Sequence, residues 1–84
     1  MKKSEKKIFE SLKKIFPKSQ IPKKISKLKI GDFPQWDSLG NFNLLLEIEK
    51  QFSCRINTKS FNKIKSVKDI KEFLKKSGNY TNKI

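Results

Sequence analysis

Residues 37–52 constrain the fold more than any other segment, because they place a strongly apolar helix directly after an aspartate. Asp37 suits the N-cap position, so we predict a helix over residues 38–52. Apolar side chains cover more than half of its circumference, which predicts a central position in the fold. Gly40 in the first turn costs about 1 kcal/mol relative to alanine. We expect it to leave room near Ser38.

Two further amphipathic helices and one short helix are predicted around this segment. Residues 4–16 carry apolar side chains at three- and four-residue steps and are predicted to form a helix. Pro17 stops this helix and pushes the neighbouring Phe16 away from helical geometry. Ser66 and Asp69 match a capping box opening a last helix, for which Gly78 would be the C-cap. Residues 58–62 predict a short helix with Phe61 pointing inward.

Residues 17–36 form a long connection between the first two predicted helices. Loops of this length are uncommon in compact domains unless packing orders them. Six apolar residues are expected to fix this loop to the core, with one helical turn near residues 23–28. Trp36 is interpreted as a loop anchor rather than a binding platform. The six are Ile21, Ile25, Leu28, Ile30, Phe33 and Trp36.

Together these elements predict an all-α fold, a small four-helix bundle with three main helices, one short helix and a long loop between the first two. The 84 residues suffice for a single small domain spanning residues 1–84. We expect its core over about residues 4–76 and a flexible tail over residues 77–84.

The chain is strongly basic, with 21 basic residues, 8 acidic residues and a net charge of +13. Such a charge suits a polyanionic partner. However, Arg55 is the single arginine, and nucleic-acid readers use arginine for bidentate contacts. Residues 32–52 hold four acids and one lysine, a net of −3, which leaves +16 elsewhere. We therefore expect no specific nucleic-acid partner, although coding bias and a functional charge both stay open as explanations.

The composition also excludes several kinds of chemistry. Cys54 is the single cysteine and histidine is absent, so no intrachain disulfide, Cys/His metal site or catalytic triad can form. Cys54 itself is expected to be a small, partly buried apolar residue. No apolar segment approaches the length of a membrane span or a leader sequence. We expect a cytoplasmic monomer that is not an enzyme.

The chain resembles acyl and peptidyl carrier proteins over nearly its whole length. Asp37-Ser38-Leu39 matches the site at which that family carries its prosthetic group. Ser66 stands 28 residues after Ser38 and opens a Ser-Val-Lys-Asp-Ile motif that is similar to the start of the family's last helix. The other matching positions are Phe33, residues 44–52 and Ile56.

The resemblance implies a carrier whose Ser38 receives 4′-phosphopantetheine from coenzyme A through a phosphopantetheinyl transferase. The terminal thiol of that arm would hold an acyl or aminoacyl group as a thioester for loading and transfer enzymes. By the same resemblance, Asp37 helps to orient the transferase. The residues expected to contact partner enzymes are Leu39, Phe42, Leu46, Glu47, Glu49 and Ile56.

Departures from the family pattern favour a specialised carrier that serves one dedicated pathway. Gly40, Asn43 and Lys50 stand where acids are common in fatty-acid carriers. The Asp-Ser-Leu-Gly start is more similar to D-alanyl and other aminoacyl carriers.

Other interpretations stay open beside the carrier. One interpretation treats Ser38 as a simple N-terminal helix residue. The chain also fits two other classes of protein, an unmodified carrier-like adaptor and a small lysine-rich nucleic-acid-binding protein. The last of these would bind with steep salt dependence. Glu47 and Glu49 are equally well interpreted as plain solvated acids. The apolar stripe of the central helix is expected to be mainly core, and it comprises Leu39, Phe42, Leu45 and Leu46.

Overall fold

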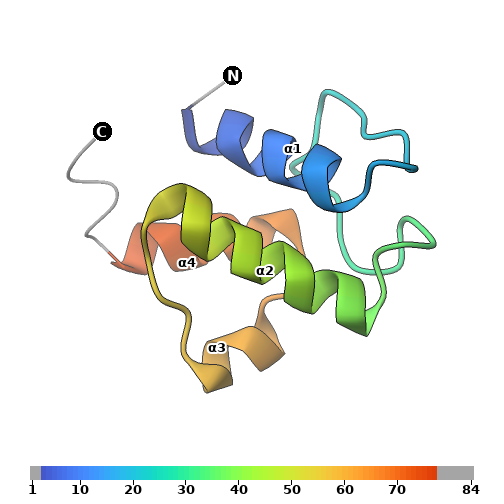
Figure 1. Cartoon of the computed structure of the whole chain (residues 1–84). Helices are drawn as coiled ribbons and strands as arrows, with labels where there is room; N and C mark the ends of the chain where they lie inside the picture. The colour runs from blue at the N-terminus through green and yellow to red at the C-terminus, as the bar shows by residue number, and fades with distance from the viewer. Residues whose placement is uncertain (1–2, 78–84) are drawn as a thin grey trace.

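The computed structural model describes residues 3–77, which contain four α-helices and no strand (Figure 1). The predicted all-α class is confirmed. Ser77 belongs to the last helix rather than to a tail, and the expectations for Gly78 and the rest of the tail lie outside the described residues. No helix in this range combines the length and apolar character needed to cross a membrane. The helices are α1 (Lys3–Ile15), α2 (Ser38–Phe52), α3 (Thr58–Lys63) and α4 (Val67–Ser77).

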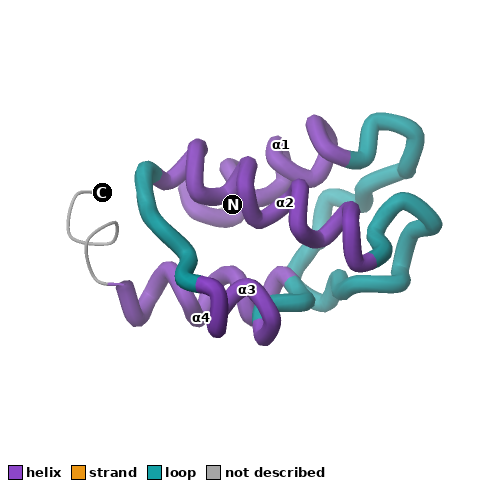
Figure 2. Tube along the Cα trace, turned by 60° about the horizontal axis from the view of Figure 1, so that its bottom comes forward, coloured by secondary structure: helices purple, strands orange, loops and turns teal. Residues whose placement is uncertain are grey.

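The helix α2 occupies the centre, as its apolar circumference predicts. The helix α1 packs along α2 and also contacts α4. Figures 1 and 2 show the loop over residues 16–37 gathered at the end of the bundle where α2 begins. The core is built from large apolar side chains of α1, α2, α4 and the connecting segments, which suits a chain with few small apolar residues, and α3 contributes no buried residue. Its largest fully buried members are Trp36, Phe16, Ile8, Leu12, Ile25, Leu44, Leu45, Ile48 and Ile70.

The C-terminal end of α1 and the N-terminal ends of α2 and α4 follow the sequence signals closely. Phe16 lies just outside α1, before Pro17. Asp37 caps α2, and its Oδ1 accepts a hydrogen bond from the N–H of Gly40 at 2.8 Å. At α4, Ser66 Oγ accepts from the N–H of Asp69 at 3.0 Å. The carboxylate of Asp69 accepts from the N–H of Lys65 rather than from that of Ser66, which differs from the predicted capping box.

The long loop is ordered by backbone hydrogen bonds as well as by its apolar side chains. The N–H of Ile30 donates to the carbonyl of Lys65 at 2.8 Å, and the N–H of Val67 donates to that of Leu28 at 2.9 Å. These two bonds join the middle of the loop to the α3–α4 junction. Within residues 23–28, where one helical turn is expected, the N–H of Leu28 donates to the carbonyl of Ile25 and closes a single turn that does not continue into a helix.

Trp36 anchors the end of the loop, as predicted, and is fully buried. Its indole Nε1 donates to Oδ1 of Asn41 at 3.0 Å, and Nδ2 of Asn41 donates to the carbonyl of Ile64 at 2.8 Å. One α2 side chain thereby links the loop to the segment that follows α3. The rings of Phe16 and Phe33 lie 5.6 and 6.0 Å from the Trp36 ring, centroid to centroid, and complete the anchor.

Replacing Asn41 with leucine is expected to destabilise the fold by about 2–4 kcal/mol, because it leaves a buried indole N–H and a buried carbonyl without partners. Urea denaturation followed by circular dichroism would measure the change. Asn62→Leu, at an exposed position on α3, is the matched control and should change stability little. Equal effects at the two positions would contradict a structural role for the Asn41 hydrogen bonds.

Gly40 is explained by close packing rather than by the room near Ser38 that we expected. A Cβ atom at this position would overlap the backbone carbonyl oxygen of Gln35 and lie 3.0 Å from the ring of Phe16. The first turn of α2 therefore rests directly on the loop. Glycine is needed here because the loop backbone approaches the helix so closely.

Gly40→Ala is expected to destabilise the protein by about 1–3 kcal/mol, since the clash with backbone outweighs the gain in helix propensity. Asn43→Ala, on the exposed face of the same helix, is expected to be neutral or slightly stabilising. Thermal unfolding of both variants tests this. A stabilised Gly40→Ala protein would show that the loop moves away without cost.

Candidate functional site

Ser38 is the first residue of α2 and is exposed to solvent. It follows directly on Asp37, whose extended backbone (φ −103°, ψ −166°) ends the loop and whose carboxylate caps the helix. The hydroxyl of Ser38 therefore stands where the free amides and dipole of a helix N-terminus favour an attached phosphate. The sequence prediction for the position of Ser38 and for the capping by Asp37 is confirmed.

Three apolar side chains of α2 point away from the core. Leu39 is 69% exposed, Phe42 49% and Leu46 43%. The expectation that the stripe is mainly core is therefore wrong for these three and right for Leu45. Apolar residues lie on two sides of α2. The side opposite Leu39, Phe42 and Leu46 faces the core, because it also carries Asn41, whose side chain is hydrogen-bonded to Trp36. The buried residues of α2 are Gly40, Asn41, Leu44, Leu45, Glu47, Ile48 and Phe52.

A hollow of about 310 Å³ lies beside Ser38. One wall is an aromatic pair, in which the rings of Phe42 and Phe61 lie 5.3 Å apart, centroid to centroid, at 39°. Phe61 was expected to point inward, and it is half-buried while also covering Phe42. Ile30 closes the hollow from the loop and Lys65 adds a positive charge. The hollow is thus lined by the apolar residues Ile30, Phe42 and Phe61 and by the polar residues Ser38, Asn41, Asn62 and Lys65.

A second, wider hollow of about 760 Å³ lies on the other side of the same face. Leu46 and Lys50 line it from α2, and Lys14 lines it from α1. The exposed face of α2 therefore has a hollow on each flank. Lysine lines both hollows, and Glu47 and Glu49 also line the wider one.

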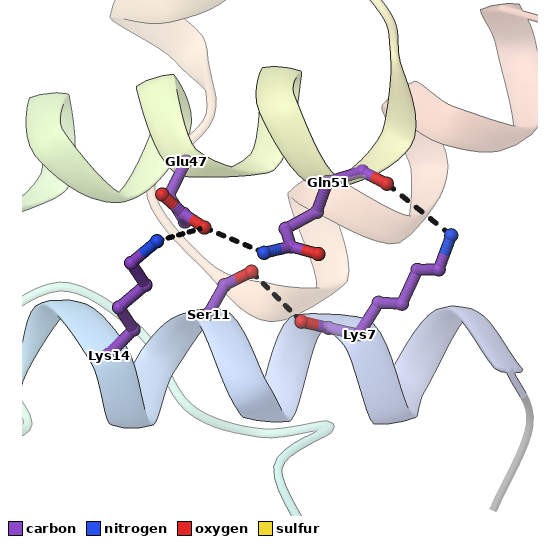
Figure 3. A network of polar contacts seen from close by, with 5 residues as sticks. All are labelled: Lys7, Ser11, Lys14, Glu47 and Gln51. Atoms are coloured by element: carbon purple, nitrogen blue, oxygen red, sulfur yellow. Dashed lines mark hydrogen bonds and ion pairs between the residues drawn. The ribbon is translucent and has the colours of Figure 1, made fainter.

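Glu47 is buried, with 6% of its surface exposed, although it lines the second hollow together with Leu46 and Lys50. Figure 3 shows Lys14 and Gln51 converging on its carboxylate in the contact between α1 and α2. Its Oε2 accepts from Gln51 Nε2 at 2.7 Å and from Lys14 Nζ at 3.3 Å. These hydrogen bonds, that of Gln51 first, lower the pKa of Glu47 although burial opposes them. The interpretation of Glu47 as a solvated acid is wrong.

Glu49 and Ile56 also serve the fold. The Oε2 of half-buried Glu49 accepts from the N–H of Ile56 at 2.7 Å, which ties the chain after α2 back to that helix. Ile56 is itself 6% exposed and packs in the core. Of the six residues expected to meet partner enzymes, the structure brings Leu39, Phe42 and Leu46 together on one exposed face. It places the other three in internal contacts.

Cys54 is half-buried beside the core, as expected for a small apolar residue. Burial raises the pKa of its thiol, and the negative charge of Glu49 raises it further. At neutral pH the thiol is therefore protonated and a weak nucleophile. Within residues 3–77, no three His, Cys, Asp or Glu side chains gather into a group that could hold a metal ion.

Sequence reasoning missed two parts of this site. Phe42 on α2 and Phe61 on α3 are 19 residues apart in the chain, and no local pattern marks such a pair. Asn41, which fixes the rotation of α2, carries a weak signal, because a polar residue inside an apolar helix often marks a buried hydrogen bond. Comparisons with protein-family models, curated proteins and solved structures find no match to this chain.

The Glu47 contacts predict a specific dependence of stability on pH. Because the folded pKa is lowered, ionised Glu47 stabilises the fold above the ordinary glutamate pKa of about 4.3. This contribution is lost as the pH falls through the lowered folded pKa. Glu47→Gln is expected to lower the free energy of unfolding by about 1 kcal/mol at pH 7, a figure that allows for the solvent exposure of Lys14.

Urea denaturation at pH 7 and near pH 3 would measure the difference between wild type and Glu47→Gln, which should shrink at the lower pH. Glu10→Gln, at an exposed position on α1, provides the matched control with the same change in charge. A difference that is constant with pH would contradict the lowered pKa.

Proposed function

We propose that this protein is a carrier that holds an acyl or aminoacyl group on a 4′-phosphopantetheine arm attached to Ser38. The observation that carries the proposal is an exposed serine at the first residue of a central helix, capped by Asp37 and bordered by exposed apolar side chains. The resemblance of Asp37-Ser38-Leu39 and of the Ser66 motif to carrier proteins supports the same reading.

The residues around Ser38 suit such an arm. The hydroxyl is exposed, as attack on a large donor requires, and the helix N-terminus favours the negative phosphodiester. Lys65 lies in the wall of the adjoining hollow and adds positive charge near that phosphate. Phe42 and Phe61 offer an apolar wall to the attached chain. Once bound, the arm supplies a terminal thiol that forms thioesters.

The attachment transfers the phosphopantetheinyl group from coenzyme A to the hydroxyl of Ser38. The Ser38 oxygen forms a bond to the phosphorus that carries pantetheine in coenzyme A, and the pyrophosphate P–O bond breaks. Adenosine 3′,5′-bisphosphate leaves, and the serine proton is taken up by the transferase or solvent. The carrier has no catalytic part in this step or in later acyl transfer. Its own residues present the serine and bind the enzymes that act on it.

A dedicated pathway, rather than general fatty-acid synthesis, fits the exposed surface of α2. The acids of this helix, Glu47 and Glu49, are engaged in internal hydrogen bonds. Partner enzymes that recognise rows of free carboxylates on a carrier would find few here. We therefore propose loading and transfer enzymes specialised for this carrier.

Incubation with coenzyme A and a broad-specificity phosphopantetheinyl transferase is expected to add the mass of one phosphopantetheinyl group. Intact-protein mass spectrometry measures the gain. Ser38→Ala should abolish it, and Ser26→Ala, at an exposed loop serine, should leave it unchanged. Circular dichroism should show both variants folded, because neither side chain is buried.

No mass gain for the folded wild-type protein with several transferases would contradict the carrier proposal and favour an unmodified adaptor. Modification that persists in Ser38→Ala would place the site elsewhere.

A further inference from the structure

Most carboxylates of this chain are engaged within the fold. Six of the eight acids accept a hydrogen bond or an ion pair from another residue of the described chain. They are Glu5, Asp32, Asp37, Glu47, Glu49 and Asp69. In the segment over residues 37–52, Asp37 is the acid that stays exposed. The net charge of −3 over residues 32–52 therefore does not describe the surface that a partner would meet.

The outward face of α2 is an apolar row that ends in a lysine. Leu39, Phe42, Leu46 and Lys50 follow one another at steps of three, four and four residues, which places them on one side of the helix. All four are exposed. We name these four residues the outward row.

Lysines stand on both flanks of the outward row. Lys65 lines the hollow that contains Ser38 and Phe42, and Lys14 lines the hollow that contains Leu46 and Lys50. The ammonium of Lys14 lies 3.3 Å from Glu47, yet its side chain is 58% exposed and reaches solvent. The row is thus apolar at its centre and has exposed lysines on both flanks. Glu47 and Glu49 also line the second hollow, where Glu47 is buried and Glu49 half-buried, and Asp37 is the exposed acid next to the row.

We propose that the outward row docks on a partner protein whose matching surface has an apolar centre rimmed by carboxylates. Such a rim would pair with Lys14, Lys50 and Lys65, and a basic partner would be repelled by them. The inference rests on the proposed function in one respect, since the partner is the enzyme that must reach Ser38.

The arrangement favours a protein over a nucleic acid. An apolar centre with a polar, charged rim is the usual anatomy of a protein interface. A nucleic-acid backbone would instead bring phosphates onto three exposed apolar side chains, and it would find lysine where arginine is preferred. The apolar row gains free energy only against an apolar surface.

The test uses a synthetic helical peptide with leucines along one side and glutamates flanking them. Titrated into the ¹⁵N-labelled 84-residue protein, it is expected to shift amide signals over residues 38–50 and at Lys65. Leu46→Ser and Lys50→Glu should each weaken binding about five-fold or more. Lys76→Glu makes the same charge change in the last turn of α4, outside both hollows, and should weaken it less than about two-fold.

Equal weakening by Lys50→Glu and Lys76→Glu would overturn the proposal, because it would show diffuse attraction to a basic protein. So would equal binding of a peptide with lysines in place of the glutamates. A DNA duplex, or vesicles containing phosphatidylserine, that shifted the outward row more strongly than the peptide would assign the surface to another class of partner.

The same experiment separates this inference from the function on which it rests. Ser38→Ala should bind the peptide as wild type does. A protein that binds the peptide but takes up no phosphopantetheinyl group would contradict the carrier function alone. A protein that is modified at Ser38 but does not bind the peptide at the outward row would contradict the docking proposal alone.

Discussion

The buried side chain of Asn41 determines how the rest of this small fold is arranged. It accepts a hydrogen bond from the indole of Trp36 and donates one to the carbonyl of Ile64. A helix that is apolar on two sides has no unique rotation from apolar burial alone, since either side would fill the core. A buried amide is satisfied in one orientation only, because an unpaired polar group in the core is costly. Asn41 thus selects which apolar side of α2 faces inward.

This selection separates the half of α2 that packs in the core from the half that is exposed to solvent. The inward half packs on α1 and on the loop, and Gly40 lets the loop backbone approach the first turn. Glu47 and Glu49 reinforce the inward half through contacts with other segments, so their charges serve stability. Ser38 is the first residue of α2, directly after the loop. Its position is therefore fixed by the fold, while its hydroxyl remains accessible.

The sequence predicted the elements well because their signals are local. The bounds of α2, the cap at Asp37 and the capping serine at Ser66 depend on residues within one turn of each other. The rotation of α2, the burial of Glu47 and the loop bonds of Ile30 depend on contacts across the chain, which no local pattern encodes. The candidate site divides in the same way. The position of Ser38 was predictable, and the two flanking hollows were not.

The exposed apolar residues of α2 need an explanation beyond stability. A single exposed leucine is ordinary in a folded protein. Leu39, Phe42 and Leu46 are different, because they form one row on one helix and the core is already closed beneath them by Leu44, Leu45 and Ile48. Their exposure contributes no burial to this chain and adds an apolar surface that water disfavours. In a chain with so many lysines, polar residues would serve a solvated face better. The position of this row beside Ser38 is what the proposed docking of a partner protein would account for.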